Sequence, residues 1–255
     1  MSPTPAEAVS VDLVDNIATV EMHRPPHNYF DLDVLTTLAD TFESLGDHPD
    51  CRVIVFCAEG KNFCAGADLS GSDVIDHTGR LYSQAARIAG AAVPTIAAVQ
   101  GAAVGGGLGL ALATDFRVAT PETRFSCNFA RLGFHQGFGI SVTLPAVVGQ
   151  QRALELMYTG GSVKGEAALA IGLADRIAPA DELRAAAREL AVEIATSAPL
   201  AVRAIRETMR GDLAARIRAA TEREAEQQEI LRRTEDFAEG VRAMAERRTP
   251  NFTGR

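Results

Sequence analysis

The sequence predicts an α/β fold, and two observations support this prediction. Short runs of β-branched and other apolar residues alternate with segments of helical periodicity through the first half of the chain. From about Asp181 onward the pattern is almost continuously helical and rich in Ala, Arg and Glu. The chain has 255 residues, of which 47% are apolar, so it can bury a large core as one domain with an appendage.

Local patterns predict the order of the elements. Asp31 precedes an amphipathic stretch as its expected N-cap, and Gly46 is its expected stop. Pro199 and Gly211 are the expected breaks in the helical second half. The other expected elements are strands over 9–15, 17–23, 51–58, 94–100, 115–120 and 123–128, and helices over 32–45, from about 73 to 90, and from about 139.

Composition excludes several classes of function. Lys and Arg number 25 against 33 Asp and Glu, a formal charge of −8, and no basic face is evident, so nucleic acid is not an expected partner. The N-terminal residues are polar, and glycines interrupt every long uncharged stretch. We therefore expect no membrane span and a cytoplasmic location. The four cysteines show no CxxC spacing and indicate buried thiols, and no metal site is indicated.

The stretch VQGAAVGGGLGLALATDF, residues 99–116, carries the strongest local signal. Each glycine in a helix costs roughly 0.5–1 kcal/mol relative to alanine. Here a buried strand runs into Gly105–Gly107 and then into a helix, whose first amides favour negative charge. Leu110 breaks the GxGxxG pattern, and no GK[ST] follows, so dinucleotide-binding and P-loop sites are excluded. Close packing of the helix on the sheet is the alternative explanation for the glycines.

A second loop, KNFCAGADL at residues 61–69, also leaves a buried strand and carries Gly66. Two such loops allow two backbone amides to converge on one carbonyl oxygen, which is an oxyanion hole. Losing one donor from such a hole typically costs about 3–4 kcal/mol of transition-state stabilisation.

Both loops, in their order and separation, resemble those of the crotonase, or enoyl-CoA hydratase/isomerase, superfamily. The likeness runs nearly from end to end. RPPHN is similar to the early RPxxN turn of that family, AEGKNFCAGADL to its first signature, and AVQGAAVGGGLGLALATDFRVA to its second. IGLADRIAP is similar to its later GLVD segment, and EGVRAMAERRTPNFTGR to its common ending.

The resemblance implies a spiral of ββα units with a C-terminal helical trimerisation region. Residues 1–195 would form the α/β core with the acyl-CoA site, and residues 196–255 the helical oligomerisation region. A homotrimer or a dimer of trimers is expected. The implied ligand is an acyl-CoA thioester, with coenzyme A as part of the substrate and no permanently bound cofactor.

The resemblance also assigns site residues. The oxyanion amides would be those of Ala67 and Gly106, which stabilise a thioester enolate. The residues expected to contact the coenzyme A moiety are His27, Cys64, Ala65, Asp68 and Leu69.

The chain departs from the family at its catalytic carboxylates. Hydratases of this family use two glutamates, whose places are taken here by Gly109 and Phe129. Another carboxylate position of the family is Gly137. His135 is a candidate proton shuttle, and the alternative is a loop histidine that makes a structural hydrogen bond or faces solvent. Cys127 and Asn128 flank the vacated position, where they either line the pocket or serve packing.

We therefore expect an acyl-CoA-processing enzyme, a lyase or isomerase of the enoyl-CoA hydratase/isomerase type, in fatty-acid or related acyl-chain metabolism. The alternative is a non-catalytic acyl-CoA-binding or carrier protein that kept the pocket after losing the acid and base.

Overall fold

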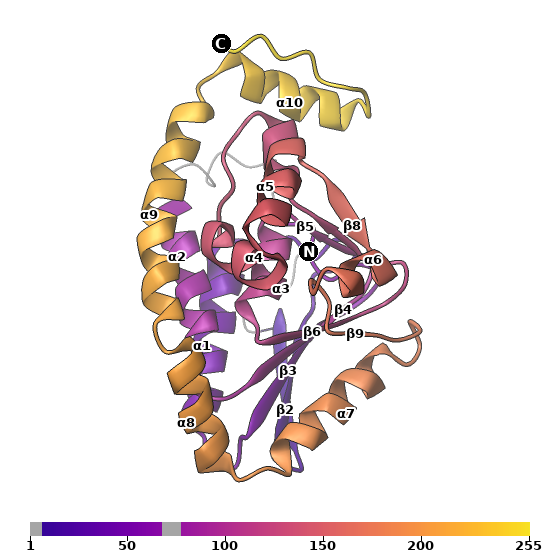
Figure 1. Cartoon of the computed structure of the whole chain (residues 1–255), viewed down its shortest axis with the longest axis vertical. Coiled ribbons are helices and arrows are strands. Elements are labelled where there is room, and N and C mark those ends of the chain that lie inside the picture. The colour runs from indigo at the N-terminus through magenta and orange to yellow at the C-terminus, as the bar shows by residue number, and fades with distance from the viewer. Residues whose placement is uncertain (1–6, 68–77) are drawn as a thin grey trace.

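A computed structural model describes residues 7–67 and 78–255 (Figure 1). A twisted sheet forms the centre of the fold, in the strand order β1, β2, β3, β4, β6, β9. All neighbouring pairs are parallel except β1 with β2. These strands span Val9–Val14, Ile17–Met22, Val53–Ala58, Thr95–Val99, Phe116–Ala119 and Arg176–Ile177.

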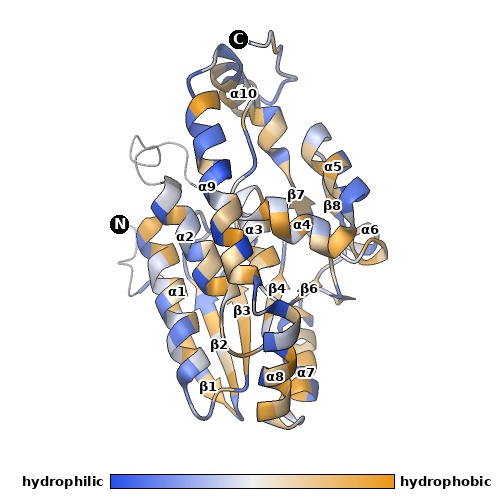
Figure 2. Cartoon of the chain, turned by 60° about the vertical axis from the view of Figure 1, so that its left-hand side comes forward, coloured by the Kyte–Doolittle hydropathy of each residue, from blue (hydrophilic) through white to orange (hydrophobic). Residues whose placement is uncertain are grey.

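Helices cover both faces of this sheet. On one face lie α1 (Leu32–Asp47) and α2 (Thr78–Ala89), and α9 (Leu213–Leu231) packs against α2. On the other face α7 (Leu183–Ala195) packs against β3 and β4. Each face has its own apolar core, and β3 is therefore buried on both sides. Figure 2 shows apolar residues along the strands of this sheet and a mixture of apolar and polar residues along α1 and α2.

A smaller sheet lies beyond the end of the first. It contains β5 (Ala102–Val104), β7 (Arg124–Ser126) and β8 (Ser162–Lys164), with β7 in the middle. The helix α3 (Gly106–Ala113) follows β5 after a single residue. The remaining helices of this region are the 3₁₀ helix η2 (Asn128–Leu132), α4 (Ile140–Val148), α5 (Gln150–Thr159) and α6 (Gly165–Ala170).

Three arginines of α8 (Pro199–Arg210) attach the C-terminal region to the core. Arg203 donates to the carbonyl of Gly46 at the end of α1, Arg206 to carbonyls at the end of α2, and Arg210 to carbonyls at the end of α3. A cation at a helix C-terminus satisfies free carbonyls and favours the helix dipole. One face of α8 therefore holds three core helices by the same kind of contact.

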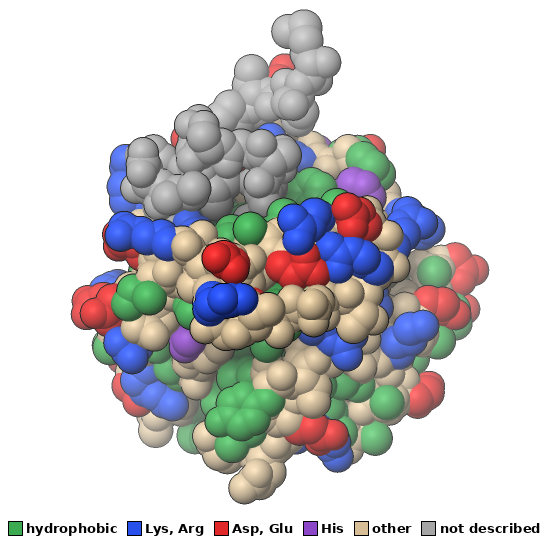
Figure 3. All heavy atoms as spheres, turned by 90° about the horizontal axis from the view of Figure 1, so that it is seen from above, with side chains coloured by type: hydrophobic (Ala, Val, Ile, Leu, Met, Phe, Trp, Pro, Cys, Tyr) green, Lys and Arg blue, Asp and Glu red, His purple; other side chains and the backbone are tan. Residues whose placement is uncertain are grey.

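The last helix, α10 (Glu235–Ala245), crosses one end of the molecule and holds the chain terminus. Asp236 accepts the amides of Thr253 and Gly254, and Glu239 pairs with Arg248. Figure 3 looks down on this end and shows basic and acidic side chains beside one another. The terminal residues are thus fixed along α10 by charge-assisted hydrogen bonds.

Most local predictions are confirmed, and one is wrong. Asp31 caps α1, accepting Val34 N at 2.9 Å, and α8 begins at Pro199 and ends before Gly211. Gly46 does not stop α1, which continues through Asp47. A Cβ on Gly46 would lie 3.1 Å from the backbone nitrogen of Ala92, so this glycine serves close packing.

Candidate active site

Two glycine turns, one after β3 and one after β5, lie side by side. Cys64 forms a parallel bridge with Ala103, and Val104 N donates to the Cys64 carbonyl at 3.0 Å. Gly66 has φ +99°, and a Cβ built on it would lie 3.0 Å from Val104 O and 3.6 Å from Gly106 N. A side chain at position 66 would strain the backbone and press against the Gly106 amide, so only glycine suits this turn.

The turn after β5 leaves the Gly106 amide outside the helical hydrogen bonds. Gly105, with φ +56°, is the N-cap of α3, and Gly109 N donates to its carbonyl at 3.1 Å. The N–H of Gly106 lies before this bond and has no acceptor within the helix. A Cβ at Gly106 would come 2.5 Å from the Phe30 ring, and one at Gly107 would come 2.1 Å from a backbone carbonyl. Close packing therefore requires glycine at positions 106 and 107, and the Gly106 amide stays free.

Ala67 directs its amide away from the strand segment beside it. Phe30 and Ala67 form a parallel bridge, in which Phe30 N donates to the Gly66 carbonyl at 3.1 Å. In a trans peptide the C=O and the N–H point in opposite directions, so the N–H of Ala67 points away from Phe30 N. Gly106 is close to this loop, since its nitrogen lies 3.6 Å from the Cβ position of Gly66.

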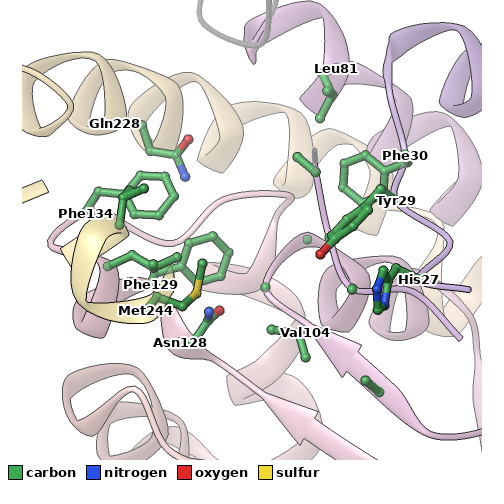
Figure 4. Close-up of a pocket in the computed structure, with 18 of the residues that line it drawn as sticks. His27, Tyr29, Phe30, Leu81, Val104, Asn128, Phe129, Phe134, Gln228 and Met244 are labelled. Carbon is green, nitrogen blue, oxygen red and sulfur yellow. The ribbon is translucent and has the colours of Figure 1, made fainter. Parts of the chain in front are cut away.

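Both turns open into one pocket with a volume of about 860 Å³. Figure 4 shows aromatic and apolar side chains around it, with the Tyr29 hydroxyl directed toward its centre. Ala67 and Gly106 are both in its wall. Within residues 7–67 and 78–255, no aspartate or glutamate lines this pocket. Its side-chain lining includes Tyr29, Phe30, Leu81, Tyr82, Asn128, Phe129, Leu132, Phe134, Gln228, Val241 and Met244.

Comparison with known proteins identifies the family. The sequence profile described as enoyl-CoA hydratase/isomerase matches residues 13–255. The chain belongs to the enoyl-CoA hydratase/isomerase family. It is 36% identical over 217 residues to the enoyl-CoA isomerase/hydratase fer4 of Mycosarcoma maydis, covering 82% of this chain and 79% of the relative. It is 30% identical over 254 residues to the crotonyl-CoA hydratase of Syntrophomonas wolfei, covering 96% and 98%.

Solved structures confirm the predicted fold class. The enoyl-CoA hydratase of Mycobacterium avium subsp. paratuberculosis superposes with a TM-score of 0.85 at 30% identity, over 96% of this chain and 98% of that one. The enoyl-CoA hydratase/isomerase of Pseudoalteromonas atlantica superposes with a TM-score of 0.84 at 28% identity, over 96% and 100%. This chain therefore has the enoyl-CoA hydratase/isomerase fold with a C-terminal helical region.

Aromatic side chains surround Gly109, Phe129 and Gly137, the three positions compared above with carboxylates of the family. Gly109 is buried against Phe138, and a Cβ at position 109 would lie 2.8 Å from Phe138 Cβ. A Cβ on Gly137 would come 2.0 Å from the hydroxyl of Tyr82. Phe129 lines the pocket, with its ring centroid 5.5 Å from that of Phe134. Positions 109 and 137 therefore have no free space for a larger side chain.

The predicted contact residues fall into three groups. His27 and Ala65 line the pocket with the two turns. Cys64 is fully buried behind the wall, where burial raises the pKa of its thiol to about 12. Asp68 and Leu69 lie outside the described residues.

The structure does not bring His135 into the lining of the pocket. Its Nδ1 lies 2.7 Å from the carbonyl oxygen of Gln136, and its own carbonyl accepts Gln228 Nε2 at 2.7 Å. The role of His135 as a proton shuttle stays a prediction. Of the two residues that precede Phe129, Asn128 lines the pocket and Cys127 is buried without lining it.

A polar contact between α2 and α9 was missed from the sequence. The Tyr82 hydroxyl donates to Gln228 Oε1 at 2.7 Å, and both side chains line the pocket. Burial, and then the charge of Glu224, raise the pKa of Tyr82 above its ordinary value. Glu224 is itself buried and accepts the amides of Gly139 and Ser141 at the start of α4. No local pattern indicates a contact between residues 146 positions apart.

The described part of the chain has neither a metal-ion cluster nor a membrane-spanning helix. No cluster of three or more His, Cys, Asp or Glu side chains there has an arrangement suited to a metal ion. None of its helices combines the length and apolar character needed to cross a membrane.

Proposed function

We propose that this chain is an acyl-CoA-processing enzyme that stabilises a thioester enolate between the amides of Ala67 and Gly106. The observation that carries the proposal is the proximity of the two turns, with the Cβ position of Gly66 3.6 Å from Gly106 N at the wall of one pocket. Two preorganised N–H donors stabilise developing negative charge on a carbonyl oxygen. Lyase and isomerase reactions of acyl-CoA thioesters share this enolate.

The lining of the pocket supports a thioester ligand. Aromatic and aliphatic side chains from α2, η2 and α10 surround the space for an apolar acyl group. We propose that coenzyme A, as part of the substrate, lies toward His27 and Ala65. Arg124 also lines the pocket and supplies positive charge for an anionic ligand. The homotrimeric or double-trimeric assembly and the cytoplasmic location stay predictions, and sedimentation measures the first.

A second function, acyl-CoA binding without catalysis, is favoured by one specific observation. The described lining of the pocket contains no carboxylate, and general acid–base groups commonly contribute 10²- to 10⁴-fold to such reactions. A carrier needs only the donors and the apolar walls.

One experiment separates the two functions. The purified protein is incubated with crotonyl-CoA and longer 2-enoyl-CoAs, while loss of the conjugated thioester absorbance and direct binding are measured. Turnover supports the enzyme, and tight binding without turnover supports the carrier. Neither binding nor turnover would contradict both.

A matched pair of variants tests whether binding uses this pocket. Phe134→Ala removes a ring from the lining and should weaken binding about tenfold, or about 1.4 kcal/mol. Tyr158→Ala removes an aromatic side chain that is 76% exposed on α5, outside the lining, and should leave binding unchanged. Equal effects of the two substitutions would place the ligand elsewhere.

A further inference from the structure

Ser10, His23 and Glu59 form a hydrogen-bonded line outside the pocket. Ser10 Oγ lies 2.7 Å from His23 Nε2, and His23 Nδ1 lies 2.9 Å from Glu59 Oε2. The three residues come from three neighbouring segments, in β1, after β2 and after β3. None of them lines the pocket that contains Ala67 and Gly106.

Backbone hydrogen bonds fix the three residues in register. Ser10 is paired with Glu21 in the β1–β2 ladder, and His23 N donates to the Ala8 carbonyl at 2.8 Å. Glu59 N donates to the Met22 carbonyl at 2.9 Å. Ser10, His23 and Glu59 are therefore held at the ends of rigid strands, which position reactive groups well.

The order of the contacts favours one tautomer of the neutral imidazole. A carboxylate accepts hydrogen bonds, so Glu59 holds the tautomer with the proton on Nδ1. Nε2 is then an acceptor, and the Ser10 hydroxyl must donate to it. This is the arrangement of nucleophile, general base and positioning carboxylate found in serine hydrolases on unrelated folds.

We propose that Ser10, His23 and Glu59 form a second, surface site that transfers the acyl group of small activated esters to Ser10 and then to water. The Ser10 side chain is exposed, whereas that of His23 is only 28% exposed, so a substrate reaches the hydroxyl while the base stays held. An open surface makes few contacts with a substrate, so we expect the site to act on small esters with good leaving groups.

The edge of the sheet supplies a hydrogen-bond donor for the oxyanion. Ala8 and Ser10 are in hydrogen-bonded pairs of the β1–β2 ladder, so the N–H of Val11 points away from β2. No strand of the described residues pairs with that edge of β1. Val11 directly follows the nucleophile, where an amide can contact the new oxyanion.

The reaction proceeds in two balanced steps. In the first step, Ser10 Oγ forms a bond to the acyl carbon as its proton moves to His23 Nε2. The ester C–O bond then breaks, and the alcohol or phenol leaves with the electron pair of that bond and this proton. In the second step, water gives a proton to Nε2 and attacks the acyl carbon, and Ser10 Oγ leaves and recovers the proton. Glu59 acts as a positioning residue throughout.

The test uses p-nitrophenyl acetate hydrolysis and labelling by a fluorophosphonate probe on the full chain. The wild-type rate should exceed that of Ser10→Ala about tenfold or more. His23→Gln should match Ser10→Ala and lose the label, and Glu59→Gln should be intermediate. Peptide mass spectrometry should place the label on Ser10. Unfolding midpoints establish that every variant is folded.

Ser162→Ala is the matched control, because Ser162 is also exposed and lies on the edge strand β8. It should keep the wild-type rate and the label. Equal hydrolysis by wild type and Ser10→Ala, or a label absent from Ser10, would overturn the proposal. Neither outcome depends on whether the acyl-CoA pocket is catalytic.

Discussion

A Cβ built on Gly109 comes 2.8 Å from the Cβ of Phe138 and 2.9 Å from its ring. Phe138 is 1% exposed, has φ +63°, and packs with ring centroids 5.4 Å from Phe30 and 6.3 Å from Tyr82. The residue is held in a backbone conformation that favours glycine, and its ring fills the space beside α3. Phe138 therefore packs directly on α3 at Gly109 and leaves no room there for a side chain.

Gly109→Glu should therefore destabilise the fold by about 2–4 kcal/mol, because the new side chain meets Phe138 in a buried site. Urea unfolding measures the change. Gly79→Glu is the control, since Gly79 is exposed on α2 with nothing within 4 Å of its Cβ position. That variant should keep its stability or gain some, and an equal loss in both variants would refute the packing argument.

Phe129→Glu should bring a carboxylate into the pocket at a position that already lines it. A new general base should raise hydration of crotonyl-CoA by about tenfold or more over wild type. Phe129→Gln has the same shape without the titratable group and should show no gain. If the glutamine variant gains as much, proton transfer by residue 129 is not the cause.

Asp115→Asn should destabilise the protein by about 3–5 kcal/mol. The Asp115 side chain is 8% exposed, and it pairs with Arg206 at 2.9 Å and with Arg210 at 2.7 Å. Removing its charge leaves two arginines of α8 uncompensated in a mostly buried site. Glu229→Gln, which breaks an exposed pair with Arg233, should cost less than about 0.5 kcal/mol in the same urea titration.

Acid should weaken the contact between α10 and the chain terminus in a defined pH range. Arg248, the amide of Asn251 and Arg242 hold the pKa of Glu239 well below its ordinary value near 4.5. A lowered folded-state pKa gives stability that is present above the unfolded-state pKa and is lost as the pH falls toward the folded-state value. The difference in unfolding free energy between wild type and Glu239→Gln should be largest near pH 7 and shrink below about pH 4.5.

Urea unfolding from pH 3 to 7 measures this difference. Glu222→Gln, an exposed position on α9, is the control and should show no such trend. A difference that stays constant across the range would show that Glu239 acts by packing and not by charge.

The backbone features of the site were predictable because glycine and capping residues act locally. Gly66 and Gly105 have positive φ at the two turns, and the Asp31 side chain caps α1 by accepting a backbone N–H of its first turn. The same logic misassigned Gly46, because close contact with Ala92 and not helix termination selects glycine there. A glycine in a sequence does not reveal which of its properties is used.

The far wall of the pocket was not predictable. Gln228 and Met244 reach it from α9 and α10, and only the tertiary fold brings these helices to the glycine turns. His135 lies close to the site in sequence but is excluded from the described lining by its contact with Gln136 and the hydrogen bond from Gln228. Sequence proximity does not give the direction of a side chain.

The central claim, that Ala67 and Gly106 donate to one thioester oxygen, is tested most directly by infrared spectroscopy of bound butyryl-CoA labelled with ¹³C at the carbonyl. Gly106→Ala and Gly106→Pro place the same Cβ near Phe30, but only proline removes the N–H, and proline is tolerated at the first position of a helix. Binding should lower the carbonyl stretching frequency in wild type and Gly106→Ala, and much less in Gly106→Pro. An unshifted carbonyl in wild type, or an equal shift in the proline variant, would contradict the oxyanion hole.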